Sequence, residues 1–191
     1  MKVVKVLLFD IHKTQVDKDF LSDADLDTLK KINSPKTRKE KAISLMVKNK
    51  YIGSYHIGEN GKPLSLGKHF NISHKDDYLA FVVDEVPVGI DIERVKPTKE
   101  RLADFISSEE EKAYIKDDVS FYEIWTNKEA LVKANGLGVR QKVESIPSLP
   151  INSLRQFEDK IYRNQTVRHK DYIITVSRES DEEYSLEIDE K

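Results

Sequence analysis

Apolar and polar side chains alternate through residues 87–93, which read Pro-Val-Gly-Ile-Asp-Ile-Glu. Successive side chains of a strand point to opposite faces, so this pattern predicts a β-strand with one apolar face and Gly89, Asp91 and Glu93 on the other. The Cα atoms of the two acidic residues would lie about 6.6 Å apart, and in a partly buried site their repulsion is on the order of 2.5 kcal/mol. A cation would relieve that repulsion, and magnesium takes such oxygen ligands together with phosphate and water. Taken alone, the pattern is better explained by a strand that faces solvent.

The remainder of the chain predicts a mixture of strands and helices. Strand patterns recur at residues 3–9, 70–73, 78–84, 88–93, 157–162, 172–176 and 184–188. Capping residues predict helix starts at Ser22, Ser34 and 107–108, and a longer helix over about 121–135 should end at Gly136. The segment 74–80 also echoes 169–174 with one deletion, as two duplicated halves that meet near residue 96 would.

Composition narrows the class of protein. The 191 residues include 35% charged and 38% hydrophobic side chains with a formal net charge of -2, a balance typical of globular proteins. The absence of cysteine excludes disulfides, thiolate zinc sites and cysteine nucleophiles. No apolar run reaches the length of a membrane span and the first residues lack a signal-peptide pattern, so we expect a cytoplasmic protein that does not contact a membrane. One segment, Lys30 to Lys50, is strongly basic and could meet an anion.

Two further segments carry polar groups in suggestive positions. Glu129 and Lys133 are four residues apart in the predicted helix and therefore share one face. An ordinary surface ion pair would look the same. Ser73 and His74 end a predicted strand, where they could donate hydrogen bonds to a phosphate, although a single histidine more often has a structural role.

The order of these segments is more specific than any one of them. The chain reads Gly-Lys-Pro at 61–63, Phe-Asn-Ile-Ser-His at 70–74, Gly-Ile-Asp-Ile-Glu at 89–93 and Trp-Thr-Asn-Lys-Glu-Ala-Leu-Val-Lys-Ala-Asn-Gly at 125–136. This series resembles the signature of the 4′-phosphopantetheinyl transferases of the surfactin-synthetase-activating type. The match extends from Lys62 to about Gly138, well over a third of the chain.

The resemblance implies a fold and an activity. The expected fold is α+β, with two similar α/β halves, residues 1–96 and 97–191, that form an intramolecular pseudo-dimer with the active site in the cleft between them. The expected reaction is Mg²⁺-dependent transfer of 4′-phosphopantetheine from coenzyme A to a serine of an apo acyl or peptidyl carrier protein, with release of 3′,5′-ADP. Mn²⁺ is an alternative metal. We expect a monomer, because such a fold already contains its own pseudo-twofold partner.

The resemblance also implies catalytic roles. Asp91, Glu93 and Glu129 match the magnesium ligands, and Lys133 matches a lysine that neutralises the pyrophosphate. The serine hydroxyl of the carrier needs a base, directly or through a metal-held water. Glu129 is the first candidate for that base, and Glu110, which aligns with a further acidic position, is the second.

A second set of positions is implied to bind coenzyme A. Ser73 and His74 match the pair near the 3′-phosphate of the nucleotide, and Lys62 matches the lysine of the Gly-Lys-Pro motif. Arg38 and Lys39 correspond to part of a basic stretch that is longer in other members of the family. Directly after His74, the family commonly has a small pair such as Ser-Gly, whereas this chain has Lys-Asp.

Two other readings remain. A different nucleotide enzyme, such as a kinase or nucleotidyltransferase, would prefer ATP over coenzyme A, but the chain has neither a Gly-x-x-x-x-Gly-Lys-Ser/Thr loop nor a Gly-x-Gly-x-x-Gly loop. A non-catalytic binder of coenzyme A or carrier proteins would bind without turnover. Zinc hydrolase chemistry is disfavoured because no His-Glu-x-x-His motif occurs, and nucleic-acid binding is disfavoured because the basic segment has no interleaved aromatic residues.

Overall fold

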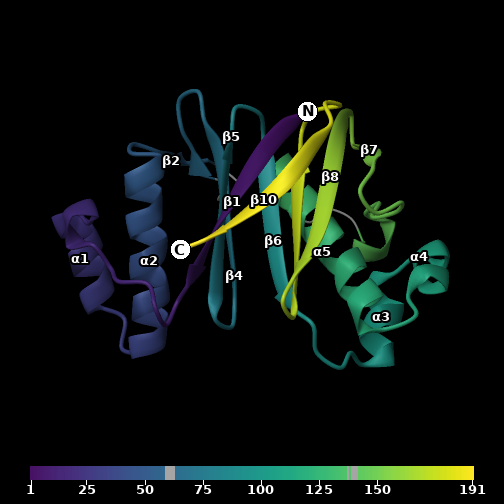
Figure 1. The fold of residues 1–191 in the computed structure, drawn as a ribbon, viewed down its shortest axis with the longest axis horizontal. Coiled ribbons are helices and arrows are strands. Elements are labelled where there is room, and N and C mark those ends of the chain that lie inside the picture. The colour runs from purple at the N-terminus through teal and green to yellow at the C-terminus, as the bar shows by residue number, and fades with distance from the viewer. Residues whose placement is uncertain (59–62, 137, 139–141) are drawn as a thin grey trace.

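The computed structural model describes residues 1–58, 63–136, 138 and 142–191. Two four-stranded sheets lie at its centre, with α1 and α2 on one side and α3–α5 on the other (Figure 1). The first sheet has the order β10 (Tyr184–Glu190), β1 (Lys2–Asp10), β5 (Tyr78–Asp84), β4 (His69–Lys75). The second has the order β6 (Val88–Arg94), β9 (Tyr172–Arg178), β8 (Lys160–His169), β7 (Leu154–Phe157). The short strands β2 (His56–Ile57) and β3 (Pro63–Leu64) pair with each other.

The helices follow the predicted capping signals at Ser22, Ser34, Ser108 and Gly136, but the helix that ends at Gly136 begins at Asp118 rather than near Phe121, and the helix at Glu100–Ile106 was not predicted. They are α1 (Asp23–Lys30), α2 (Pro35–Tyr51), α3 (Glu100–Ile106), α4 (Glu109–Tyr114) and α5 (Asp118–Asn135), with short 3-10 turns η1 (Lys18–Phe20) and η2 (Val143–Ser145). The side chains of Ser22, Ser34 and Ser108 each accept a hydrogen bond from a backbone N–H in the first turn of the helix that follows. Helix α5 ends at Gly136, whose φ of 77° places it in the left-handed region that glycine adopts freely.

Apolar alternation along the strands divides the core into layers. The main cluster fills the space between the two sheets with inward side chains of β1, β5, β6, β9 and β10. On the outer face of the first sheet, α2 packs Ile43, Met46 and Val47 against Phe70 and Phe81. Helix α5 covers the outer face of the second sheet. The α+β class expected from the sequence is therefore confirmed.

Each sheet contains one strand that the sequence analysis assigned to the other half. Strand β6, within 1–96, is the edge strand of the second sheet, and β10, within 97–191, pairs in parallel with β1 in the first sheet. The sheets therefore do not follow the boundary at residue 96, and the division of the chain into two halves stays a prediction.

The two echoing segments form corresponding hairpin turns. Asp76 between β4 and β5 and Lys170 between β8 and β9 each open a two-residue turn with a positive φ, of 49° and 56°. The tyrosines that follow these turns, Tyr78 and Tyr172, meet edge to face with ring centroids 5.1 Å apart. The sequence echo thus marks two similar turns that contact each other in space.

The sheets also approach each other where β4 runs beside β6. The backbone N–H of Ile90 donates a hydrogen bond of 3.0 Å to Asn71 Oδ1, which bridges the two strands. This contact brings the polar end of β4 alongside the face of β6 that carries the carboxylates.

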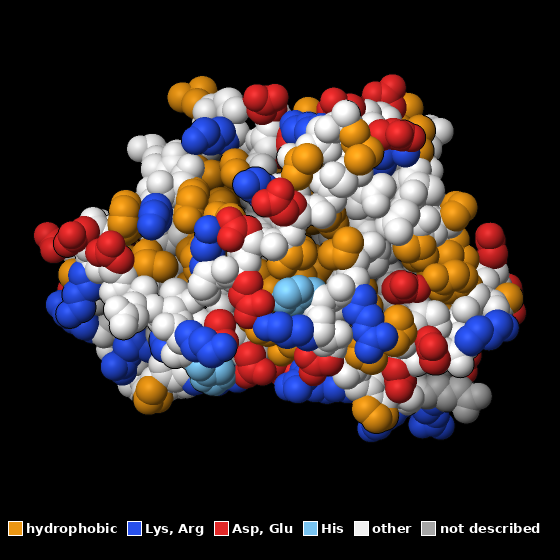
Figure 2. All heavy atoms as spheres, in the orientation of Figure 1, with side chains coloured by type: hydrophobic (Ala, Val, Ile, Leu, Met, Phe, Trp, Pro, Cys, Tyr) orange, Lys and Arg blue, Asp and Glu red, His pale blue; other side chains and the backbone are white. Residues whose placement is uncertain are grey.

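The outer surface carries both signs of charge. In Figure 2, acidic and basic side chains are interspersed over the whole face, with apolar atoms between them. Among the described residues, no helix is both long and apolar enough to cross a membrane.

Candidate active site

The polar faces of β4, β6 and α5 enclose a hollow of about 400 Å³, here called the junction pocket. Its lining is Ile72, Ser73, His74, Lys75, Asp91, Ile92, Glu93, Trp125, Glu129 and Lys133. Segments that are far apart in the sequence therefore meet at one place. Each of the three motifs at 70–74, 89–93 and 125–136 contributes some of its residues to the pocket.

Gly89 allows α5 to lie directly on β6. A Cβ atom at this position would come within 2.2 Å of the carbonyl oxygen of Ala130 and 2.3 Å of the backbone nitrogen of Ala134. Only glycine fits at that separation, because real Cβ atoms do not approach backbone so closely. The close approach sets Glu129 and Lys133 opposite the strand that carries Asp91.

Buried hydrogen bonds also fix α5 to the second sheet. The hydroxyls of Thr126 and Thr175 lie 2.7 Å apart, and Asn127 Nδ2 donates to Thr166 Oγ1 over 2.8 Å. These polar residues of the helix are fully buried. Such a satisfied network fixes the rotation of α5 and therefore which of its residues face the pocket.

Only one of the two carboxylate oxygens of Asp91 has hydrogen-bond partners among the described residues. Its carboxylate is 4% exposed, and Oδ1 accepts hydrogen bonds from Lys133 Nζ at 2.6 Å and Ser73 Oγ at 2.9 Å. The other oxygen, Oδ2, is buried without a hydrogen-bond partner. An unpartnered carboxylate oxygen inside a polar pocket is a free ligand position.

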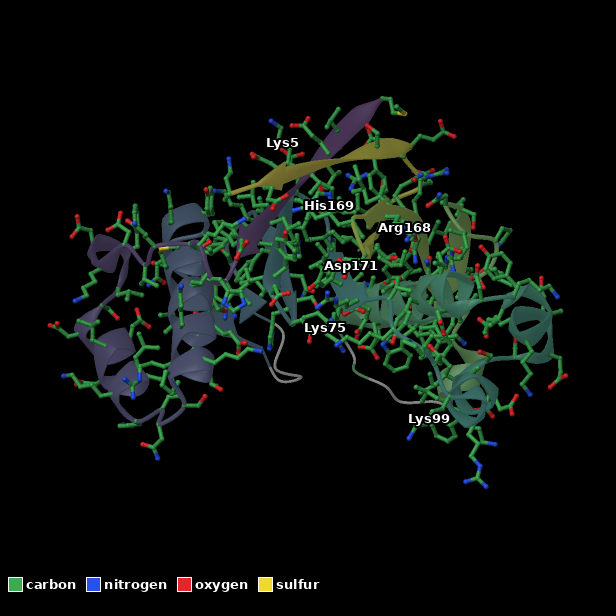
Figure 3. The ribbon with its side chains drawn as sticks, turned by 60° about the horizontal axis from the view of Figure 1, so that its bottom comes forward. Lys5, Lys75, Lys99, Arg168, His169 and Asp171 are labelled. Carbon is green, nitrogen blue, oxygen red and sulfur yellow. The ribbon has the colours of Figure 1, made fainter. Side chains whose placement is uncertain are left out.

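Glu93 contacts a lysine from the neighbouring strand. Lys75 Nζ lies 2.6 Å from Glu93 Oε2, as an ion pair rather than an aligned hydrogen bond. Burial of the ammonium lowers the pKa of Lys75, but the contact with Glu93 outweighs it, so the pKa lies above its ordinary value. Figure 3 shows Lys75 between the α1–α2 side of the molecule and the α3–α5 side.

Glu129 lies close enough to Asp91 and Glu93 for their negative charges to affect its pKa. Burial is the largest influence that raises the pKa of Glu129, and the negative charge of Asp91 adds to it. Lys133 opposes this increase, and Glu93 contributes to it. The charges of Asp91 and Glu93 thus reach Glu129 and disfavour its ionisation, an effect that a cation would reverse.

The residues present fit a hard divalent cation. The donors are carboxylate oxygens, which magnesium prefers, and one of them is buried and unpartnered. Within the described ranges, however, no three His, Asp or Glu side chains are already arranged around a common metal position. Lys75 and Lys133 instead hold the strand carboxylates, so cation binding would require these contacts to rearrange.

The predicted nucleotide-binding residues are only partly gathered. Ser73 and His74 line the pocket. Arg38 is exposed and Lys39 is half-buried at the start of α2, where they donate hydrogen bonds to the backbone carbonyls of Ile32 and His12, outside the pocket lining. Lys62 lies outside the described residues.

Glu110 also lies away from the junction pocket. It is exposed in the first turn of α4 and is not part of the pocket lining, whereas its neighbour Glu111 is buried. Glu111 Oε2 lies 2.8 Å from Lys128 Nζ, and Ser148 Oγ donates a short hydrogen bond to Oε1. Sequence reasoning missed this buried pair. The available signal was that Lys128 is rotated by about 100° from Glu129 around the helix and so faces a different side.

A larger hollow of about 730 Å³ lies between α3, α4 and η2. Its charged side chains come from α3, α4 and the start of η2, but it contains none of the motif residues at 70–74, 89–93 or 125–136. The junction pocket is therefore the better candidate, because residues of three sequence motifs meet there around a buried carboxylate oxygen of Asp91 that has no hydrogen-bond partner.

Comparison with known proteins identifies the class to which this fold and site belong. Residues 87–187, just over half of the chain, match the family model of the 4′-phosphopantetheinyl transferase superfamily. The chain therefore belongs to this superfamily, and the resemblance recognised in the sequence is confirmed.

Several curated transferases are similar to the chain. It is 36% identical to the 4′-phosphopantetheinyl transferase psf-1 of Bacillus pumilus over 95 aligned residues. The aligned region covers 45% of this chain and 41% of that protein. It is 36% identical over 123 residues to the transferase gsp of Aneurinibacillus migulanus, covering 61% and 47%. It is 35% identical over 91 residues to the transferase Sfp of Bacillus subtilis (strain 168), covering 44% and 37%. The chain thus spans less than half the length of each of these relatives.

Proposed function

We propose that this chain transfers 4′-phosphopantetheine from coenzyme A to a serine of an apo acyl or peptidyl carrier protein and releases 3′,5′-ADP. The observation that carries the proposal is the meeting of Asp91, Glu93, Glu129 and Lys133 in the junction pocket. Membership of the transferase superfamily supports the reaction class. The names of the similar proteins support the group that is transferred.

In this proposal, Asp91, Glu93 and Glu129 hold magnesium, or manganese in its place, against the diphosphate of coenzyme A. When bound, the metal supplies Lewis-acid polarisation and charge neutralisation. Lys133 turns from Asp91 to the diphosphate and balances the charge that develops on the departing 3′,5′-ADP. Glu129 accepts the proton of the carrier serine, directly or through a metal-held water. Glu110 remains the second candidate for this base, although its exposed position on α4 offers no route to the pocket without movement.

Nucleotide binding is proposed for Ser73 and His74 at the pocket rim. Lys62, Arg38 and Lys39 complete this set as predictions, and the last two would have to leave their backbone partners. The matching hairpins with their contacting tyrosines support two similar halves, 1–96 and 97–191, arranged as an intramolecular pseudo-dimer with the pocket in their cleft. We propose further that the protein acts as a cytoplasmic monomer that binds neither membrane nor nucleic acid.

The test is to mix the protein with coenzyme A, MgCl₂ and an apo carrier protein and to measure the carrier's mass. The carrier should gain one phosphopantetheine with wild type, and this gain should be lost with Asp91→Ala and Glu129→Ala. Glu109→Ala is the matched control, because its side chain is 92% exposed and, among the residues that the structure describes, pairs only with Lys112.

Each alternative outcome has a clear meaning. Full transfer by Asp91→Ala or Glu129→Ala would remove the metal and base assignments. Binding of coenzyme A without transfer to any carrier would support a non-catalytic binder, and a preference for ATP over coenzyme A would support a different nucleotide enzyme.

A further inference from the structure

Lys75 has no part in the proposed reaction, yet its ammonium group contacts the carboxylate of Glu93, a proposed metal ligand. It is the last residue of β4 and lines the junction pocket together with Glu93. It also lines an adjoining hollow of about 210 Å³ with Glu93 and Trp125. Its Nζ lies 2.6 Å from Glu93 Oε2, with the two side chains 37% and 16% exposed.

The junction pocket balances most of its charge without any ligand. Three carboxylates, those of Asp91, Glu93 and Glu129, face two ammonium groups. Lys133 holds Asp91 at 2.6 Å, and Lys75 holds Glu93 at the same distance. The carboxylates of Asp91 and Glu93 are therefore each already paired with the ammonium group of a lysine.

A metal ion and Lys75 cannot both occupy Glu93 favourably. A magnesium ion binds carboxylate oxygen at about 2.1 Å, so on the same oxygen it would lie less than about 5 Å from the ammonium. Two positive charges at that separation repel strongly in a partly buried site. The metal must displace the lysine or lose Glu93 as a ligand.

The contact is suited to such an exchange. It is an ion pair without hydrogen-bond alignment, and the lysine lies at the end of a strand with more than a third of its side chain exposed. A flexible, partly hydrated ammonium can swing into water at small cost. Asp91 differs, because its ion pair is more deeply buried and is shared with Ser73.

We propose that Lys75 is a built-in counter-ion that occupies the Glu93 carboxylate until a divalent cation replaces it. Lys75 is thus a positioning residue that weakens the binding of free metal and makes occupancy of the site depend on the anionic ligand arriving with it. This inference rests on the metal role assigned to Glu93 in the proposed function.

The test measures Mn²⁺ affinity in the absence of coenzyme A, by the electron paramagnetic resonance signal of free Mn²⁺ at about 0.15 M salt. Trp125, the only tryptophan, lines the pocket and gives a second readout by fluorescence. Lys75→Met should bind Mn²⁺ about two- to fivefold more tightly than wild type, the range for loss of one partly screened ion pair. Lys75→Arg should keep wild-type affinity because it keeps the charge.

Lys96→Met is the matched control. Lys96 also carries one positive charge near the site, but it pairs with Asp76 at 2.7 Å rather than with Glu93. Its Mn²⁺ affinity should change by less than about twofold, because screened charges without direct contact interact weakly. Lys75→Gln provides a second neutral variant if the methionine variant does not fold.

Several results would overturn the inference. Unchanged or weaker Mn²⁺ binding by Lys75→Met and Lys75→Gln would do so, as would an equal gain in Lys96→Met, which would indicate a net-charge effect. Absence of Mn²⁺ binding in every variant would also overturn it. The carrier assay separates these failures from that of the proposed function, since transfer by wild type can persist when Lys75 proves irrelevant to metal binding.

Discussion

At the scale of single residues, a buried charge next to the candidate site stands out. Lys128 directly precedes Glu129, but its side chain is 1% exposed and pairs with Glu111. Its ammonium also donates hydrogen bonds to the carbonyls of Val143 and Glu144, at 2.9 and 3.4 Å. Burial lowers the pKa of Lys128, although Glu111 opposes that change. The charge persists in the interior only because these partners surround it.

Lys128→Met should therefore lower the free energy of unfolding by about 3–5 kcal/mol, because Glu111 would remain buried and charged without its partner. Urea denaturation measures this loss. The control is Lys112→Met, which breaks the exposed pair with Glu109 and should leave the free energy of unfolding nearly unchanged. Equal losses in the two variants would contradict the distinction between buried and exposed pairs.

The sequence predicted some of these residue positions but not others. Alternation placed Asp91 and Glu93 on the face of β6 opposite the apolar cluster, as observed, and helical spacing placed Glu129 beside Lys133. The contact between Lys75 and Glu93 could not be predicted, because it depends on how closely two strands from different sheets approach.

At the scale of elements, the candidate site depends on the contact between α5 and β6. Gly89 makes this contact possible, since a methyl group there would overlap the backbone of the helix at Ala130 and Ala134. The helix backbone cannot yield as a flexible side chain could, so the whole element would have to shift. A shift of α5 moves Glu129 and Lys133 together.

Gly89→Ala should therefore reduce both stability and Mn²⁺ binding. Overpacking typically costs about 1–3 kcal/mol, and a clash with backbone belongs at or above the upper end of that range. Thermal unfolding and Mn²⁺ titration measure the two effects. Gly53→Ala is the comparison, because it has open space around it but a φ of 76°, so it reports backbone strain of about 1 kcal/mol alone. Metal binding by Gly89→Ala at wild-type strength would contradict the dependence on α5.

Most elements were predictable from local signals, whereas their arrangement was not. The expected strands 78–84 and 88–93 and the helix ending at Gly136 match β5, β6 and α5 closely, because alternation and capping are local properties. The parallel pairing of β10 with β1 joins residues at opposite ends of the chain. No local pattern specifies such a partner, because the pairing depends on which apolar faces the tertiary structure brings together.

At the scale of the whole molecule, a buried ion pair joins the two sheets. Asp84 on β5 and Arg178 on β9 lie 2.8 Å apart and are each 1% exposed, and Lys2 Nζ contacts the same carboxylate at 2.9 Å. Burial raises the pKa of Asp84, but the hydrogen bonds from Arg178 and then Lys2 outweigh it, so the pKa lies below its ordinary value. The folded protein therefore holds this carboxylate charged more strongly than the unfolded chain does.

The sign of the resulting pH dependence follows from linkage. A lowered folded-state pKa gives stability that is fully present above the ordinary aspartate pKa of about 3.9 and is lost as the pH falls through the folded value. Asp84→Asn should thus cost about 3–5 kcal/mol at pH 7, because Arg178 stays buried and charged without its partner. The difference from wild type should narrow below about pH 4, because the Asp84 carboxyl of the unfolded wild-type chain then takes up a proton while the folded protein still holds it charged. Urea unfolding of both proteins between pH 7 and pH 3 measures this difference, in which acid effects common to both cancel. A difference that stays constant down to pH 3 would mean that folding does not lower the pKa of Asp84 and that its charge does not stabilise the contact between the sheets.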